Sequence, residues 1–250
     1  MVADNRYLSR RRKGYGYQTL RPINCLIFIA LPLAFFQWGA ANYGTDLVTP
    51  QHLHSLLRFF GATAAYLPAL MIVFVLLAQQ AAHKDGWSVQ PKAIAGMLGE
   101  SIFWTGPLIV LSLVTGHVTA NAAASIAESP QGQQALQHAL RAIGAGIYEE
   151  FVFRLIFISL AMLIFVDILG LRKDVIAVGA VIVAAVIFSL GHFTPEELTG
   201  QVHFERGRFL FLATAGVYWG ALFVFRGFGI AVGCHILWDV FVLISQPTPG

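Results

Sequence analysis

Residues 147–169 read IYEEFVFRLIFISLAMLIFVDIL. A helix of about 20 mostly apolar residues is long enough to cross the hydrocarbon core of a bilayer, so this stretch predicts a membrane span. Glu149, Glu150 and Arg154 nevertheless lie inside it. A charged side chain at the middle of a membrane costs about 2.5 to 3.5 kcal/mol on insertion scales, and such residues usually mark a pathway or a reacting site. These three charges are therefore the most informative feature of the chain.

The rest of the chain has the same apolar character. Of its 250 residues, 57% are hydrophobic and 12% are charged, and the mean hydropathy is +0.68. These values lie outside the range of soluble globular domains and predict an integral membrane protein. We expect an all-α, polytopic transmembrane bundle of about seven spans. The apolar windows lie at residues 23–39, 56–78, 93–115, 147–169, 174–192, 208–225 and 229–246.

Basic residues indicate how this bundle is oriented. Arg10, Arg11, Arg12 and Lys13 precede the first window, and the net charge of the chain is +3. Lys and Arg collect in cytoplasmic loops, so the pattern predicts a multi-pass protein of the plasma membrane with a cytoplasmic N-terminus. The basic balance thus reports orientation, and we expect no nucleic-acid partner. We divide the chain into a basic cytoplasmic segment and one transmembrane domain, at residues 1–22 and 23–250.

Two segments depart from the simple pattern. The connector at 193–207 falls on the outer side by the same rule, yet it carries Arg206, with Arg208 just beyond. Residues 133–143 extend the fourth window, and one helix over both would measure about 55 Å at 1.5 Å per residue, which is too long to span a bilayer. We therefore expect a break at Gly144-Ala145-Gly146, preceded by a helix that lies in the membrane interface.

The first polar group is the trio of charges in the fourth window. Residues four apart share a face of a helix, whereas adjacent residues diverge by about 100°. Glu150 and Arg154 should therefore form a pair, and Glu149 should point elsewhere. A buried carboxyl group outside that pair is suited to act as a general base. The alternative is that all three charges form one structural network between helices.

Two later windows each add a histidine. Phe188 and His192 lie four residues apart near the end of the fifth window, and His235 and Asp239 repeat the spacing in the last window. Imidazole exchanges protons near neutral pH, and a neighbouring carboxylate can orient it or ligate a metal with it. Each pair could instead be a helix cap or an interhelical hydrogen bond. Because unsatisfied polar groups are costly in hydrocarbon, we expect the three polar faces to meet.

Taken in chain order, these residues resemble the motifs of the CPBP family of intramembrane proteases. That family includes CAAX prenyl endopeptidases of the Rce1 type and bacteriocin-processing (Abi) and immunity proteins. The resemblance covers about residues 145–245, and it implies a helical bundle with a water-filled cavity and peptide-bond hydrolysis within the membrane. The motifs read Glu149-Glu150-x-x-x-Arg154, Phe188-x-x-x-His192 and His235-x-x-x-Asp239.

The resemblance also implies roles for individual residues. Glu149 is expected to activate water together with His192, and the positions of His235 and Asp239 are those assigned to oxyanion stabilisation. Asp239 stands where asparagine is common in the family, and an ionised carboxylate cannot donate a hydrogen bond to an oxyanion, so its role stays open. A Zn²⁺ ion is a variant, with ligands drawn from these same four side chains. The candidate catalytic residues are Glu149, Glu150, Arg154, His192, His235 and Asp239.

Three functions are compatible with these patterns. The first is an intramembrane endopeptidase that acts on a membrane-associated or lipidated peptide or protein, with membrane lipid as its surroundings. The second is a non-catalytic immunity or scaffold protein of the same family. The third is a proton-coupled transporter, which is disfavoured because the two halves of the chain show no inverted repeat or pair of broken helices. Substrate, metal dependence and oligomeric state stay open at this level.

Overall fold

The computed structural model describes residues 14–43, 66–82, 86–116 and 132–245. This part of the chain folds into helices, and it contains no strand, which confirms the all-α class. Most of the basic segment expected at 1–22 lies outside the described residues, and so does the first part of the window at 56–78.

Five helices of the described part are long and apolar enough to cross a membrane, so the chain is a multi-pass membrane protein. The expectation of seven spans is confirmed in part, because two windows carry shorter apolar helices. One of these, α6, has 16 residues, or about 24 Å at 1.5 Å per residue, less than a hydrocarbon core of about 30 Å. The long segments are Pro22–Tyr43 (α3), Pro91–Thr115 (α7), Leu136–Ile168, Lys173–Leu190 (α11) and Arg206–Arg226 (α13). The shorter apolar stretches are Pro68–Ala82 within α6 (Leu67–Ala82) and Phe228–Leu243 within α14 (Phe228–Ser245).

The break expected at residues 144–146 is wrong. Helix α9 (Gly132–Glu150) runs through them without interruption, because the glycines serve close packing. A Cβ atom at Gly144 would overlap the ring of Phe36, and one at Gly146 would overlap Ile236. The helix then continues to Ile168 through η1 (Phe151–Ile156), α10 (Phe157–Ala161) and η2 (Met162–Ile168), of which η1 and η2 are π-helical.

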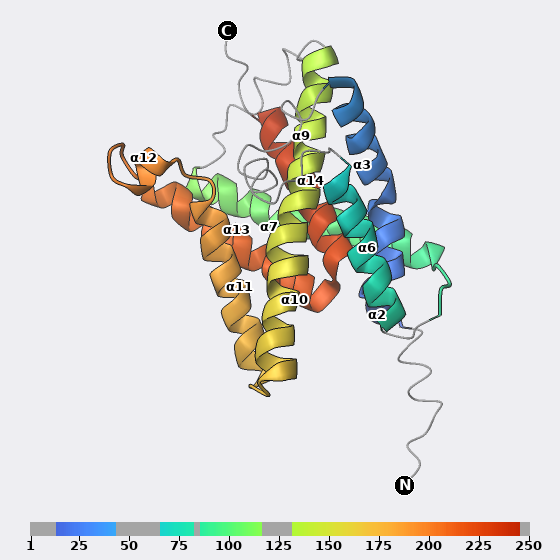
Figure 1. Cartoon of the computed structure of the whole chain (residues 1–250). Coiled ribbons are helices and arrows are strands. Elements are labelled where there is room, and N and C mark those ends of the chain that lie inside the picture. The colour runs from blue at the N-terminus through green and yellow to red at the C-terminus, as the bar shows by residue number, and fades with distance from the viewer. Residues whose placement is uncertain (1–13, 44–65, 83–85, 117–131, 246–250) are drawn as a thin grey trace.

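The helices are arranged around this long segment. Figure 1 shows it running through the molecule, with α3 and α6 on one side and α11 and α13 on the other. Helix α14 packs against α9, α7, α13 and α3, which makes it the central helix of the bundle. A residue on α14 can therefore meet side chains from several different helices.

The two ends of the bundle differ. Arg226, at the end of α13, lies beside the short N-terminal helix α2 (Tyr15–Thr19), with its guanidinium carbon 5.7 Å from the centre of the Tyr15 ring. The turn that follows consists of Gly227, whose φ of +96° favours glycine. Helix α12 (Pro195–Leu198) lies at the opposite end (Figure 1). Arg226 and the N-terminal helix thus share one end of the molecule.

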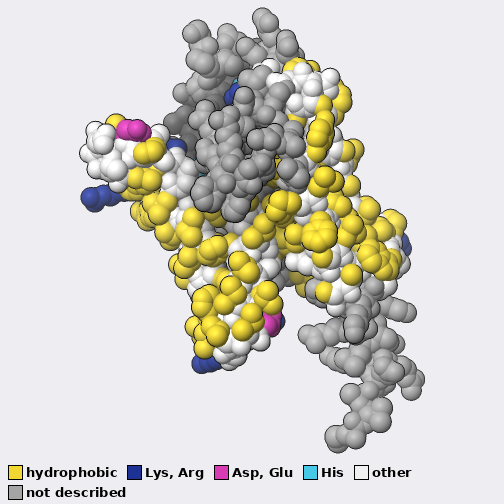
Figure 2. Space-filling model, viewed as in Figure 1, with side chains coloured by type: hydrophobic (Ala, Val, Ile, Leu, Met, Phe, Trp, Pro, Cys, Tyr) yellow, Lys and Arg dark blue, Asp and Glu magenta, His cyan; other side chains and the backbone are white. Residues whose placement is uncertain are grey.

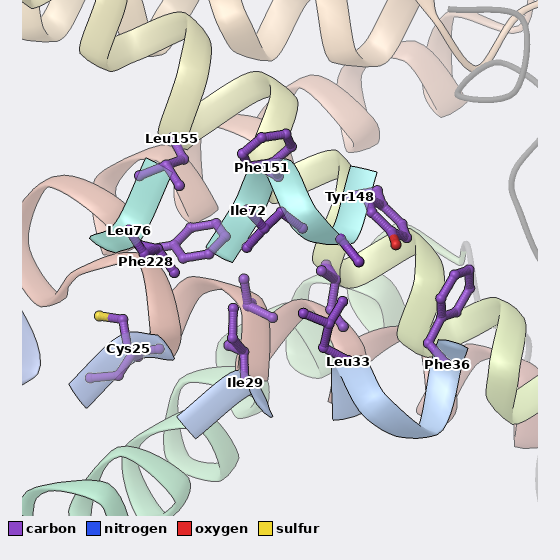
Figure 3. Packing of buried hydrophobic residues seen from close by; sticks show 14 of the residues in the cluster. Cys25, Ile29, Leu33, Phe36, Ile72, Leu76, Tyr148, Phe151, Leu155 and Phe228 are labelled. Atoms are coloured by element: carbon purple, nitrogen blue, oxygen red, sulfur yellow. The ribbon is translucent and has the colours of Figure 1, made fainter. Parts of the chain in front are cut away.

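Apolar packing joins the first half of the chain to the second. Figure 3 shows Ile72 and Leu76 of α6 between Ile29 of α3 on one side and Phe151 and Leu155 of η1 on the other. Figure 2 shows hydrophobic side chains over much of the described surface on the face in view. A surface of this kind marks contact with a membrane or a partner in a folded protein. The apolar exterior agrees with lipid contact by the bundle.

Helices α11 and α13 approach each other especially closely. Gly216 and Gly220 lie four residues apart on α13, which is the small-xxx-small spacing of close helix contacts in membranes. A Cβ atom at Gly216 would lie 2.9 Å from the Cα atom of Ala185, and one at Gly220 would lie 2.7 Å from a methyl carbon of Val181. This contact places α13 directly beside the helix that leads to His192.

Candidate active site

The charges of the first motif lie where the long helix changes its winding. Glu149 and Glu150 are the last residues of α9, and Arg154 lies in η1. The N–H of Phe157, just after η1, bonds to the carbonyl oxygen of Val152, five residues back, as in a π-helix. Such turns occur mostly as single insertions in α-helices and are frequent at functional sites. The winding changes immediately after the glutamates.

The predicted pair of Glu150 and Arg154 is present. Arg154 Nη1 lies 3.1 Å from Glu150 Oε1, and both residues are fully buried. Arg154 Nη2 donates a hydrogen bond of 3.1 Å to the carbonyl oxygen of Gly216, and its guanidinium carbon lies 4.8 Å from the centre of the Phe188 ring. Arg154 therefore ties the long helix to both α11 and α13.

His235, on the central helix α14, lies close to three carboxyl groups of the cluster. Its Nδ1 lies 2.8 Å from Glu150 Oε1, and because an ionised carboxylate only accepts, Nδ1 donates this bond. Its Nε2 faces two more carboxyl groups, with Glu149 Oε2 at 3.7 Å and Asp239 Oδ2 at 3.7 Å. Trp219 stacks on the imidazole, with ring centres 3.8 Å apart and planes 14° apart. The ring is thus fixed along one edge and on one face.

His192 approaches Glu149 from another helix. It lies just beyond the end of α11, and its Nδ1 is 2.8 Å from the carbonyl oxygen of Phe188. A carbonyl oxygen only accepts, so Nδ1 carries the proton and Nε2 is left as the atom that faces Glu149, at 4.0 Å from Oε2. The centre of the Phe188 ring lies 4.7 Å from that of the His192 ring and 6.0 Å from that of the His235 ring, so Phe188 lies beside both imidazoles.

Exposure indicates where this cluster can be reached. The side chains of Glu149 and His235 are each 3% exposed, whereas those of His192 and Asp239 are 25% and 23% exposed. The cluster is therefore approached from the side of His192 and Asp239. A substrate that reached Glu149 from there would pass both of these residues.

The spacing around Glu149 suits a bound water molecule. Its Oε2 lies 3.7 Å and 4.0 Å from the Nε2 atoms of His235 and His192. Direct hydrogen bonds between nitrogen and oxygen span about 2.7 to 3.2 Å, so these separations are too long for direct bonds. Polar atoms farther apart than about 3.5 Å are commonly bridged by water. The arrangement can hold a water molecule between a carboxylate base and an imidazole.

Residues 131–241 match the protein family described as Type II CAAX prenyl endopeptidase Rce1-like. The chain contains a domain of this family. The match extends from the start of α9 into α14 and so includes every residue of the cluster, while α3, α6 and α7 lie outside it. No curated protein and no solved structure matched the chain.

A protein-bound Zn²⁺ ion is held by three or more donor side chains. Among the described residues, no three His, Cys, Asp or Glu side chains are grouped so that they could hold a metal ion. The four side chains named as Zn²⁺ ligands are therefore not arranged as a metal site in this part of the chain.

A cavity of about 720 Å³ lies on another face of the central helix. Its walls include Ile94 and Leu98 of α7, Ile29 of α3 and Val232 and Ile236 of α14. None of the candidate catalytic residues lines it. The cavity is almost entirely apolar and is separate from the polar cluster of the Rce1-like domain.

Two features of the site were missed in the sequence analysis. Trp219, which stacks on His235, was not predicted, although the spacing of Gly216 and Gly220 on either side of it marks a close helix contact. Arg208 was noted only as an exception to the charge pattern. Outside the site, Glu100 of α7 pairs with Arg226 at the far end of α13.

Proposed function

We propose that this protein is an intramembrane endopeptidase that hydrolyses a peptide bond in a membrane-associated or lipidated peptide or protein. The observation that carries the proposal is the approach of Glu149 Oε2 to the Nε2 atoms of His192 and His235, which come from separate helices. The Rce1-like family supports the reaction class, because its description names prenyl endopeptidases. The apolar helices support a substrate that lies in or beside the bilayer.

Glu149 acts as the general base. A water molecule donates one hydrogen to Glu149 Oε2 and the other to His192 Nε2, which is an acceptor because Nδ1 holds the ring proton. Glu149 removes the first hydrogen, and the hydroxide attacks the carbonyl carbon of the scissile bond. The carbon–nitrogen bond then breaks, and the proton on Glu149 passes to the leaving amine. A positioned base of this kind contributes about 100- to 10,000-fold to a rate.

His235 stabilises the oxyanion that forms during the attack. Glu150 accepts from Nδ1 and so aims Nε2 at the reacting centre, where a second ring proton makes Nε2 a donor. Asp239, whose Oδ2 lies 3.7 Å from Nε2, supplies negative charge beside that cation and does not itself donate to the oxyanion. In this assignment Asp239 acts through its negative charge, whereas an asparagine at this position would donate a hydrogen bond to the oxyanion.

Glu150 and Arg154 support the reaction without touching the substrate. Glu150 holds His235, and Arg154 balances the charge of Glu150 while it bonds to α13. Their full burial agrees with this role, because neither side chain is reached from outside. They are positioning residues, whereas Glu149, His192 and His235 contact the reacting atoms.

The proposal is tested by reconstituting the full chain in liposomes with peptides that end in a CAAX sequence, either prenylated or unmodified. Mass spectrometry of the products identifies the bond that is cleaved. We expect the wild-type protein to cleave the prenylated peptide, and we expect His192→Ala to reduce turnover at least about 100-fold while the protein stays folded. Equal turnover by wild type and His192→Ala would overturn the assignment.

One observation favours the non-catalytic alternative. The bonds among Glu150, Arg154 and His235 would also stabilise a purely structural cluster. That account predicts that substitutions of Glu149 act through stability, so that biological activity follows the amount of folded protein. A Glu149 variant with normal stability and no activity contradicts it.

A further inference from the structure

Two arginines interrupt the charge pattern at the start of α13. Arg206 is exposed, and no hydrogen bond or ion pair of its side chain is found within the described residues. Arg208, two residues later, makes three contacts. The charge pattern of the sequence predicts that the connector at 193–207 lies on the outer side, from which Lys and Arg are usually depleted. Because Arg208 makes these contacts and Arg206 does not, the contacts of Arg208 indicate what this side chain holds in place.

The strongest contact of Arg208 is with the backbone of His192. Its Nη2 donates a hydrogen bond of 2.6 Å to the carbonyl oxygen of that residue. His192 lies beyond the last residue of α11, and carbonyl groups at a helix end have no partner within the helix. Basic side chains near a helix C-terminus can satisfy such carbonyls. Arg208 therefore fixes the peptide unit from which the imidazole projects.

The other contacts of Arg208 fold the connector over this point. Its Nη1 lies 3.5 Å from Glu197 Oε1, in the short helix α12, and its guanidinium carbon lies 4.8 Å from the centre of the Phe193 ring. Phe193 in turn stacks on Phe204, with ring centres 4.6 Å apart. Glu197 is itself held in place, because it closes the capping box of α12 with Thr194. One guanidinium thus links His192, the residue after it and α12.

The imidazole of His192 makes a separate hydrogen bond, which Nδ1 donates to the carbonyl oxygen of Phe188. That bond sets the rotation of the ring, but it leaves the backbone beyond α11 to be fixed by other contacts. The hydrogen bond of 2.8 Å from Ser189 Oγ to the carbonyl oxygen of Phe209 joins α11 to α13 one turn before His192. Arg208 makes the corresponding link at His192 itself.

We propose that Arg208 is a positioning residue for His192, which it holds in register with Glu149 by joining the end of α11 to α12 and α13. The inference rests on the proposed function. Displacing a catalytic group by about 1 Å can cost about 100-fold in rate, so loss of this link should lower turnover more than substrate affinity.

The test compares Arg208→Gln with Arg206→Gln, which removes the same charge from the same first turn of α13. Turnover and KM are measured with the prenylated peptide, and the unfolding midpoint is measured in the same detergent. We expect Arg208→Gln to lower kcat about 10- to 100-fold with little change in KM, and Arg206→Gln to leave both unchanged. Equal kcat values for the two variants would overturn the inference.

A second pair of variants separates positioning from loss of fold. Arg208→Lys keeps the positive charge and can donate a hydrogen bond, but its ammonium group lacks the planar fork that reaches both acceptors. We therefore expect it to restore part of kcat. Glu197→Gln should lower kcat less than Arg208→Gln does, and Glu196→Gln, at the exposed neighbouring position, should not lower it. Turnover by Arg208→Lys no higher than that of Arg208→Gln would count against the hydrogen bond to His192.

Hydrogen exchange gives a readout that does not depend on peptidase activity. Amide exchange over residues 189–198 should be faster in Arg208→Gln than in Arg206→Gln, and identical exchange would overturn the inference. If the wild-type protein cleaves no peptide, the proposed function fails while this comparison still tests the link. If the wild-type protein cleaves and requires Glu149, but is indifferent to Arg208→Gln, only the positioning role fails.

Discussion

Two ionic clusters in the bundle use the same kinds of residue for different ends. Near α2, Glu100 accepts two hydrogen bonds from Arg226, with Nε to Oε2 at 2.8 Å, and the side chains of Arg226 and Glu100 are 27% and 23% exposed. In the proposed active-site cluster, Glu150 and Arg154 are fully buried, and Glu150 is also bonded to His235. In the first cluster, one ion pair joins α7 to α13. In the second, Glu150 also holds the imidazole of His235 beside a further carboxylate, that of Glu149.

The surroundings of the two clusters explain this difference. Tyr15 closes the first cluster, and burial together with the Glu100 carboxylate raises the pKa of its phenol, so the hydroxyl stays protonated as a donor at neutral pH. In the second cluster, Trp219 and Phe188 surround His235 with aromatic rings, while Glu149 faces two imidazoles. A pair that satisfies its own charges is structural, and a carboxylate held beside two imidazoles is equipped to transfer protons.

The largest expected difference in stability is between Arg154→Leu and Arg226→Leu. Removing one partner of a buried ion pair costs about 3 to 5 kcal/mol, because the other charge is left uncompensated. A partly exposed pair contributes about 1 kcal/mol or less. Unfolding of both variants in the same detergent, followed by circular dichroism, measures the difference. Equal losses of stability would show that the two clusters do not differ in the way described.

The next prediction concerns Trp219, whose indole covers one face of His235. Trp219→Leu removes the stacked ring, and we expect turnover to fall about 10- to 100-fold because His235 is no longer held at the right angle. Trp219→Phe retains an aromatic face and should keep most of the turnover. Measurement of kcat for both variants checks this, and a leucine variant as active as the phenylalanine variant would argue against the stacking role.

The smallest expected effect concerns the contact between α11 and α13. Gly216→Ala places a methyl group 2.9 Å from the Cα atom of Ala185, and overpacking of this kind costs about 1 to 3 kcal/mol. Gly179→Ala is the control on α11, because a Cβ atom there meets nothing within 4 Å. Unfolding midpoints of the two variants measure the cost. Unchanged stability in Gly216→Ala would show that the helices can separate freely.

The motif residues could be brought together from the sequence because their spacing carries geometry. The interval of four residues predicted the pair of Glu150 and Arg154, and the cost of polar groups in hydrocarbon predicted that His192 and His235 would meet the same cluster. The all-α class followed from the apolar windows. Each of these inferences depends on local periodicity or on composition, which the sequence displays directly.

Other features depend on contacts between segments that are distant in the sequence. The break expected at residues 144–146 was wrong because Phe36 and Ile236 pack against those glycines, and neither residue is near them in the chain. The amino-acid composition of residues 151–156 does not distinguish the π-helical turn after Glu150 from an ordinary α-helix. Trp219 and Arg208 lie on α13, which carries no motif residue, so their roles emerge only when α13 is placed beside α11.

The most direct test of the central claim compares Glu149→Gln with Glu100→Gln in the same cleavage assay. Both changes remove one carboxylate from a helix of the bundle, but only Glu149 faces His192 and His235. We predict that Glu149→Gln lowers turnover about 100- to 10,000-fold with little change in the unfolding midpoint, and that Glu100→Gln stays active. Undiminished cleavage of the peptide by Glu149→Gln would contradict the account.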